Sequence, residues 1–271
     1  MVELFESQIV ELNRHSSKGN QLKWRDGDTW YKADYMGYEG LSEYLISQLL
    51  KCSSLNADEY VLYEPERIRY KRQIYNGVRS QHFLQGEWQI ITLERLFANA
   101  FGGSLHESVW HITDAGERFK FLFSQVERLT GLHGFGSYMA KLLTIDAFFL
   151  NEDRHTHNIA VLMNAAGEYR LCPIFDNGGA LLSDTKLDFP LSADVYELMH
   201  EVRAKTISAD FDDQLDAAEQ YYSSSIRFTF DRSDVDALLS NAAAFYSEAE
   251  IERVRTVVYQ QMRKYSYLFS V

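Results

Sequence analysis

The chain has 271 residues, of which 46% are hydrophobic, so it can bury a sizeable core as one large domain or as two lobes. Its formal net charge of −12 disfavours nucleic acid or an anionic membrane as a direct partner, because phosphate groups would be repelled overall. The two cysteines, Cys52 and Cys172, are too few for a disulfide framework, so we expect a cytoplasmic protein with reduced thiols. The most apolar run, residues 139–150, is too short to cross a bilayer.

The first third of the chain has the pattern of a β-rich unit with one helix. Apolar and polar residues alternate in short runs, and turn sequences such as Asp26-Gly27-Asp28 and Asn76-Gly77 separate some of them. Apolar residues at helical spacing predict a helix over Glu39–Leu50. The predicted strands cover residues 8–12, 21–25, 29–35, 60–63, 68–74 and 78–84.

The remainder of the chain is predicted to be mostly helical. Helices are expected to begin at Thr92 and near Asp114, and a strongly apolar helix is expected over residues 136–150. Two strands, 159–163 and 169–174, should flank a turn at residues 164–167, and helices should dominate from Val195 onward. The last helix, over residues 247–269, starts with a serine three residues before Glu250, which is the pattern of a capping box.

The segment between the apolar helix and the end of the predicted hairpin carries the most informative chemistry. It reads N-E-D-R-H-T-H-N, and D-N-G follows after the two strands. Asp153 could accept a proton from an attacking hydroxyl, while Asn158 and Asp176 offer the hard oxygen ligands that suit Mg²⁺. His155 could donate to Asp153 or to the γ-phosphate of ATP. Each residue alone could merely cap a turn, but the order and spacing of all three favour phosphoryl transfer.

Residues near the N-terminus could complete a nucleotide site. Lys32 lies on a predicted strand, where an inward-facing lysine could hold the α- and β-phosphates. Glu43, one turn into the following helix, could pair with it. The loop over residues 16–23 could close over the phosphates through backbone N–H groups, with Lys18 or Lys23 adding positive charge. This arrangement predicts an α+β, bilobal kinase-like fold, with an N-lobe over residues 1–90 and a helical C-lobe over residues 91–271.

A metal-dependent hydrolase is an alternative from a different class. Asp153, His155, His157 and Asp176 could together ligate a transition metal. The two histidines alternate, so both would face one side of an extended segment. No further cluster of histidines or carboxylates in the sequence supplies a complete set of ligands.

The segment from Asn151 to His155, with Asn158 and Asp176-Asn177-Gly178, resembles the catalytic and metal loops of HipA-like serine/threonine kinases. The D-R-H-x-x-N string is also similar to that of phosphoinositide kinases, which share the atypical protein-kinase fold. The family's phosphate loop is similar to Ser17-Lys18-Gly19-Asn20-Gln21-Leu22-Lys23, and Lys32 occupies the place of its ATP lysine. The resemblance covers about residues 10–180.

This resemblance implies an ATP- and Mg²⁺-dependent serine/threonine kinase with Asp153 as the catalytic acid, Asn158 and Asp176 as Mg²⁺ ligands and Lys32 on the nucleotide phosphates. The expected partners are a protein with a serine or threonine hydroxyl and an antitoxin-like regulator. Some family members autophosphorylate a serine of the phosphate loop, for which Ser16 and Ser17 are the candidates here. A small-molecule or lipid-headgroup kinase and a pseudokinase binding module remain alternatives.

Two departures from the family pattern qualify the resemblance. HipA toxins of a toxin–antitoxin system carry an extra N-terminal subdomain with no counterpart before Gln8, so we expect a compact kinase core. Asn177 stands where conventional kinases have the phenylalanine of D-F-G, and no A-P-E segment follows, so a conventional activation loop is not expected.

Overall fold

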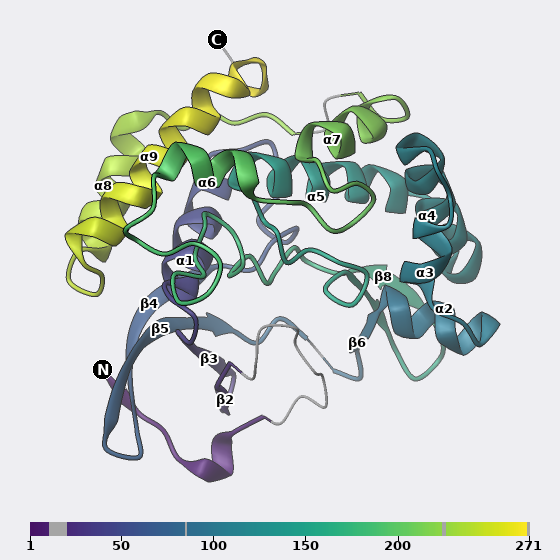
Figure 1. The fold of residues 1–271 in the computed structure, drawn as a ribbon. Helices are drawn as coiled ribbons and strands as arrows, with labels where there is room; N and C mark the ends of the chain where they lie inside the picture. The colour runs from purple at the N-terminus through teal and green to yellow at the C-terminus, as the bar shows by residue number, and fades with distance from the viewer. Residues whose placement is uncertain (11–20, 85, 224–225, 270–271) are drawn as a thin grey trace.

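The computed structural model describes residues 1–10, 21–84, 86–223 and 226–269. It confirms the predicted fold class, because a curled sheet with one helix forms one lobe and helices form most of the other (Figure 1). The sheet lies at the lower left of Figure 1, and the helices of the C-lobe lie above it and to its right. Within the described residues, no helix has both the length and the apolar character that a membrane span requires.

The N-lobe sheet has five strands in the order β1-β4-β5-β3-β2. Only β1 and β4 are parallel, and the other neighbours are antiparallel. The predicted Asp-Gly turn joins β2 to β3, with Gly27 at a φ of 56°. The expected strand at residues 8–12 is wrong in its described part, because residues 6–8 form a 3₁₀ turn and only Ile9 bridges to Trp24. The strands are β1 (Val2–Glu3), β2 (Lys23–Asp26), β3 (Thr29–Ala33), β4 (Tyr63–Tyr70) and β5 (Gln73–Gln81).

The predicted turn at Asn76-Gly77 is wrong, because both residues lie inside the long strand β5. The chain turns instead at Lys71 and Arg72, which both have positive φ angles, of 45° and 66°. A Cβ at Gly77 would overlap the carbonyl oxygen of Lys32 on the neighbouring strand. The glycine therefore allows β3 and β5 to approach closely, and this cross-strand contact is invisible in a local turn pattern.

Helix α1 (Glu39–Leu50) has the predicted bounds but not the predicted single buried face. Every residue from Gly40 to Leu50 is buried. The helix is enclosed because it packs on β4 and β5 on one side and on α8 on another (Figure 1). Its side chains share one continuous apolar core with those of the C-lobe helices, so the position of α1 depends on both lobes.

The C-lobe contains the predicted hairpin and a third strand that the sequence did not reveal. β6 pairs with β7, and β7 pairs with β8, so the small sheet has three antiparallel strands. Thr92 and Asp114 cap the helices that follow them, as expected, through side-chain oxygens that accept backbone N–H groups. The elements are β6 (Gln89–Thr92), α2 (Leu93–Phe101), α3 (Leu105–Trp110), α4 (Ala115–Thr130), α5 (Phe135–Phe149), β7 (Ala160–Met163) and β8 (Tyr169–Leu171).

The last part of the chain packs helices against α5 and α1. The predicted capping box at Ser247 and Glu250 is present and starts the final helix. That helix ends at Lys264, earlier than predicted, and residues 266–268 form a 3₁₀ turn. These helices are α6 (Val195–Glu201), α7 (Phe211–Glu219), α8 (Arg232–Ala242) and α9 (Glu248–Lys264).

Candidate active site

The predicted catalytic residues converge where the two lobes meet. Helix α5 ends at Phe149, and the left-handed backbone of Leu150 (φ 55°) then redirects the chain into the loop that carries Asp153 and Asn158. Strand β8 leads to Asp176, which also has a positive φ of 63°. Strand β3 and helix α1 present Lys32 and Glu43 to these loops from the N-lobe.

Lys32 makes two short ion pairs, one with Glu43 of its own lobe and one with Asp176 of the C-lobe. Its Nζ lies 2.6 Å from Oε1 of Glu43 and 2.7 Å from Oδ1 of Asp176. Burial alone would lower the pKa of Lys32, but the charges of Asp176 and Glu43 outweigh it and raise the pKa well above its usual value. Burial would likewise raise the pKa of Asp176, yet Lys32 holds it well below its usual range. Lys32 and Asp176 are therefore both ionised at neutral pH.

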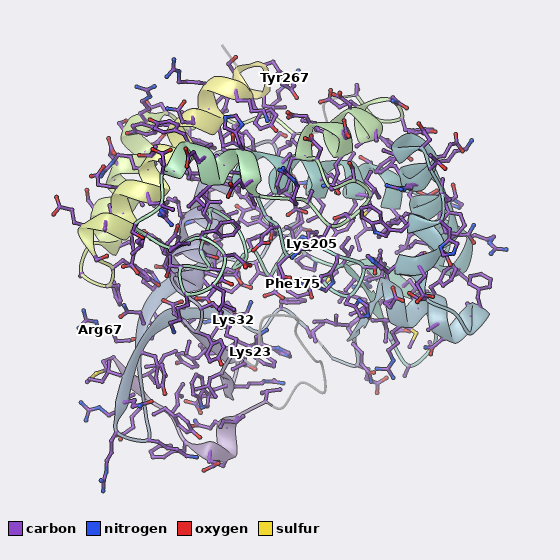
Figure 2. All side chains as sticks on the ribbon, in the orientation of Figure 1. Lys23, Lys32, Arg67, Phe175, Lys205 and Tyr267 are labelled. Atoms are coloured by element: carbon purple, nitrogen blue, oxygen red, sulfur yellow. The ribbon has the colours of Figure 1, made fainter. Side chains whose placement is uncertain are left out.

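Lys23 adds positive charge beside this ion pair. It lies directly opposite Lys32 in the antiparallel register of β2 and β3, so both side chains project from the same face of the sheet (Figure 2). Its charge contributes to the low pKa of Asp176, which places it near the acid. The other predicted phosphate-loop residues, Ser17, Lys18, Gly19 and Asn20, lie outside the described residues.

Asp153 and Asn158 contact each other in the loop after α5. The side-chain amide of Asn158 donates to the carbonyl oxygen of Asp153 at 2.8 Å and to its Oδ2 at 3.3 Å. A Cβ at Gly179 would lie 2.6 Å from the Cβ of Asp153, so only glycine lets the loop after Asp176 pass this close. The loop after Asp176 is thus packed directly against Asp153, more than twenty residues earlier in the chain.

His155 flanks Asp153, with Nε2 at 3.7 Å from Oδ1 of the acid. Burial, with help from the nearby charges of His157 and Lys205, lowers the pKa of His155 to about 4. The imidazole is therefore neutral near pH 7 and can donate one proton in a hydrogen bond. His155 and His157 also contact each other, with ring centroids 5.4 Å apart.

Arg154 connects the loop of Asp153 to the loop of Asp176, a role that its place in the sequence motif did not reveal. Its Nε donates to both carboxylate oxygens of Asp146, at 3.1 and 3.2 Å. Its terminal nitrogens donate to the carbonyl oxygens of Asn158 (3.2 Å) and Phe175 (2.9 Å) and to Oδ1 of Asn177 (2.7 Å). The guanidinium therefore fixes the backbone beside both predicted metal ligands.

Two further residues were not assigned a site role from the sequence, although each carried a signal. Asp146 is an acid inside a strongly apolar helix, and such a residue needs a buried partner. Asn177 replaces the phenylalanine of D-F-G; its backbone N–H donates to Oε2 of Glu43 at 2.9 Å, while its side chain accepts from Arg154. Asn177 thus joins α1 to the loop of Asp153.

The oxygen ligands present fit Mg²⁺. Because the amide nitrogen of Asn158 is committed to Asp153, its amide oxygen is turned away from that residue and can serve as a ligand. Asp176 supplies an ionised carboxylate, one oxygen of which contacts Lys32. In the described part of the chain, no group of three or more His, Cys, Asp and Glu side chains could hold a metal ion, and this applies to the four residues of the hydrolase alternative.

Comparison with known proteins identifies the fold. No family model matches the chain, and no curated protein is similar to it in sequence. Among solved structures, a proinflammatory kinase of Helicobacter pylori, CtkA, is similar to it with a TM-score of 0.60 and 17% sequence identity, over 97% of this chain and 95% of that one. The similarity covers both lobes, so the chain has a bilobal kinase-like fold.

Proposed function

We propose that the chain is an ATP- and Mg²⁺-dependent serine/threonine protein kinase of the HipA-like type, with an N-lobe over residues 1–90 and a C-lobe over residues 91–271. The observation that carries this proposal is the pairing of Lys32 with both Glu43 and Asp176 where the lobes meet. Removing charged groups from water costs several kcal/mol per ion, and the attraction between paired charges only offsets this cost. Buried clusters of this kind therefore occur more often at functional sites than in ordinary cores.

The roles of the residues follow from their positions. Lys32, held by Glu43, supplies positive charge for the nucleotide phosphates, and Lys23 adds to it from the neighbouring strand. Asn158 and Asp176 would hold Mg²⁺, which neutralises phosphate charge when it is bound. Asp153 accepts the proton of the attacking hydroxyl, because it lies in the same loop as Asn158 and is hydrogen-bonded to it.

The remaining parts of the proposal concern substrate and regulation. The substrate would be a cytoplasmic protein with a serine or threonine hydroxyl, and an antitoxin-like protein could regulate the enzyme. Autophosphorylation at Ser16 or Ser17 would add about two negative charges beside the nucleotide phosphates and so inhibit ATP binding. The name of the Helicobacter pylori protein, a kinase, supports phosphoryl transfer in this fold.

The test is incubation with labelled ATP and Mg²⁺, followed by peptide mapping, together with calorimetry of nucleotide binding. We expect label on a serine or threonine with the wild type. Asp153→Ala should bind Mg-ATP almost normally yet lower turnover by about 10²–10⁴-fold, because it removes only the proton acceptor. Asp176→Ala should weaken binding as well.

Three results would contradict parts of the proposal. Wild-type turnover in Asp153→Ala would refute the assignment of the base. Label that appears on a small molecule while proteins stay unlabelled would favour a small-molecule kinase. A chain that binds no Mg-ATP would be a pseudokinase module or belong to another class.

A further inference from the structure

Four segments of the chain meet at Gly40, in the first turn of α1. A Cβ on this glycine would lie 2.8 Å from Oδ1 of Asp34, 2.8 Å from the hydroxyl oxygen of Tyr246 and 3.0 Å from the carbonyl carbon of Gly77. Space at this point is therefore sufficient only for a hydrogen atom. We call Asp34, Gly40, Gly77 and Tyr246 the α1 junction. It joins the β3–α1 link, α1 itself, strand β5 and the loop between α8 and α9.

Asp34 fixes the short chain segment that connects β3, which carries Lys32, to α1, which carries Glu43. Its Oδ1 accepts the backbone N–H of Gly40 at 2.6 Å, and its own backbone N–H donates to the carbonyl oxygen of Asn76 at 2.8 Å. Glu43 lies one helical turn after Gly40, and a helix is rigid over that distance. A displacement of the first turn of α1 would therefore move the carboxylate that holds Lys32.

Tyr246 belongs to the loop that joins α8 to α9, and this loop is attached to the N-lobe. The guanidinium of Arg67 on β4 donates to the carbonyl oxygen of Ala244 and lies over the ring of Phe245, 5.7 Å from its centroid. The side-chain amide of Asn76 on β5 donates to the carbonyl oxygen of Phe245. Three contacts thus fix the loop to the sheet beside the start of α1.

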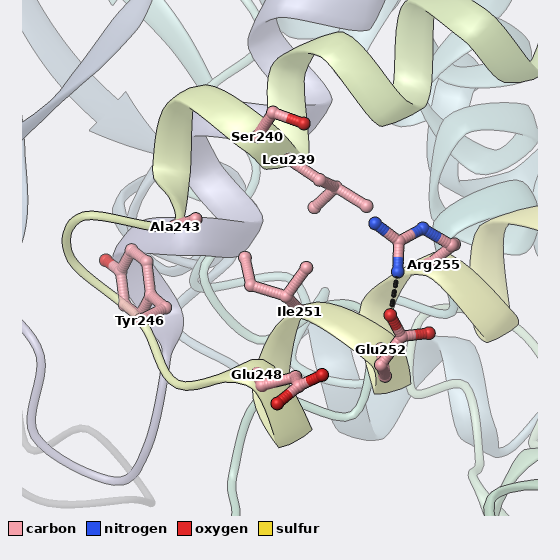
Figure 3. A pocket seen from close by; sticks show the side chains of 8 residues that line it. All are labelled: Leu239, Ser240, Ala243, Tyr246, Glu248, Ile251, Glu252 and Arg255. Atoms are coloured by element: carbon pink, nitrogen blue, oxygen red, sulfur yellow. Dashed lines mark hydrogen bonds and ion pairs between the residues drawn. The ribbon is translucent and has the colours of Figure 1, made fainter.

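The same pair of helices is hydrogen-bonded to the rest of the C-lobe, to which it belongs. Gln261 of α9 donates to the carbonyl oxygen of Ala147 in α5 at 2.9 Å. Arg253 of α9 donates to the carbonyl oxygens of Phe189 (2.6 Å) and Pro190 (2.8 Å), in the segment after Asp176. Tyr246 also lines a pocket of about 290 Å³ between α8 and α9 (Figure 3). The α8–α9 pair therefore contacts both lobes and has some free space between its helices.

We propose that the α8–α9 pair sets the position of the Lys32–Glu43 ion pair, with Asp34 and Tyr246 as positioning residues that act on α1 through Gly40. This inference rests on the proposed function, because the ion pair matters for catalysis only if the chain binds ATP. The path is continuous. Helix α9 is hydrogen-bonded to α5, and the loop before α9 is hydrogen-bonded to the sheet. Asp34 is in turn hydrogen-bonded to Gly40, in the first turn of the helix that carries Glu43.

The charges at the α1 junction specify which substitution should be tolerated. Burial raises the pKa of Asp34 to about 8. Glu39 of α1 and Glu250 of α9 also raise it, while the hydrogen bond from the Gly40 N–H lowers it. Oδ2 of Asp34 and the Tyr246 hydroxyl are buried but do not reach hydrogen-bond geometry with each other. Asp34 is thus protonated near neutral pH, and asparagine matches that form in shape and charge.

The experiment follows the backbone amide of Asn177 by NMR hydrogen exchange in the full chain without nucleotide. This N–H donates to Glu43, so its protection reports the position of the Glu43 carboxylate and does not depend on catalysis. Asp34→Ala removes the acceptor for Gly40 and should speed exchange at Asn177 by about tenfold. Asp34→Asn keeps the acceptor and should retain wild-type exchange.

A second pair of variants tests how the loop between α8 and α9 is attached to the sheet. Both substitutions are at exposed residues, where they should not prevent folding. Arg67→Ala removes the contact with Ala244 and should speed exchange at Asn177 severalfold. Arg69→Ala, at another exposed arginine of the same strand, should leave exchange at Asn177 unchanged.

Wild-type exchange at Asn177 in folded Asp34→Ala and in Arg67→Ala would overturn the inference, and the Arg67 result alone would decide if Asp34→Ala does not fold. Equal effects of Arg67→Ala and Arg69→Ala would also overturn it. A chain that binds no ATP but shows the expected exchange pattern would refute the proposed function and leave this positioning intact.

Discussion

Substitution of Arg154 by methionine tests whether one buried guanidinium fixes the two loops of the candidate active site. Arg154 and Asp146 have side-chain exposures of only 2% and 1%, so their ion pair has almost no contact with water. Methionine fills a similar volume but cannot donate a hydrogen bond. The substitution therefore leaves the Asp146 carboxylate without its charge partner, and it leaves the acceptors on Asn158, Phe175 and Asn177 without their donor.

The expected loss of stability has two parts. Removal of one partner from a buried ion pair costs about 3–5 kcal/mol, because the other charge stays desolvated. Of the three acceptors that lose their donor, only Oδ1 of Asn177 accepts a fully buried hydrogen bond, and its loss costs about 1–3 kcal/mol more. A total of about 4–8 kcal/mol is a large part of the 5–15 kcal/mol that is typical of folded domains. The double variant Asp146→Asn/Arg154→Met should recover about 2–4 kcal/mol, because it removes the unpaired charge.

Urea unfolding at neutral pH, followed by circular dichroism, measures both quantities. Turnover should stay low in the double variant even where it is folded, because the carbonyl groups beside Asn158 and Asp176 still lack their common donor. A cost below about 1 kcal/mol for Arg154→Met would refute the buried-pair argument. Wild-type turnover in the folded double variant would refute the role of Arg154 in positioning the two loops.

Three further predictions follow from the site and the α1 junction. Gly179→Ala should lower turnover by about 10²-fold, because the new Cβ would displace Asp153. Gly178→Ala should have little effect, because the atom nearest to its new Cβ would lie 3.3 Å away. Equal turnover of the two variants would contradict this prediction. The ring protons of His155 should show no NMR titration above about pH 5, since its pKa is lowered to about 4, and a midpoint between about 6 and 7 would disprove it. Because the pKa of Asp34 is raised to about 8, this carboxyl group stays protonated to a higher pH in the folded state than in the unfolded state. The unfolding free energy of the wild type should therefore fall by up to about 1.4 kcal/mol per pH unit between about pH 4 and about pH 8. Asp34→Asn should lack this slope, and a difference in unfolding free energy between it and the wild type that is the same at about pH 5 and about pH 7 would contradict the prediction.

The sequence determined features that depend on near neighbours along the chain. The capping box at Ser247, the Asp-Gly turn after β2 and the bounds of α1 all follow from local patterns and appear where they were predicted. The order of Asp153, Asn158 and Asp176 also predicted kinase-like chemistry, because side chains that follow a helix and a hairpin are brought to one place by short connections. The kinase-like fold confirms the predicted fold class, and the chemistry of these residues stays a prediction.

Only the tertiary structure decided which residues hold these parts in place. Arg154 gathers acceptors from two loops, and Tyr246 approaches Gly40 across about two hundred residues of chain. The glycine at position 77 looked like a turn residue, but it is needed for the approach of a strand that lies far away in sequence. Local patterns record the conformational preferences of adjacent residues, whereas burial, ion pairing and close backbone contacts depend on which distant segments pack together. The sequence therefore identified the groups that could perform the chemistry, and the packing of the two lobes determined how they are held.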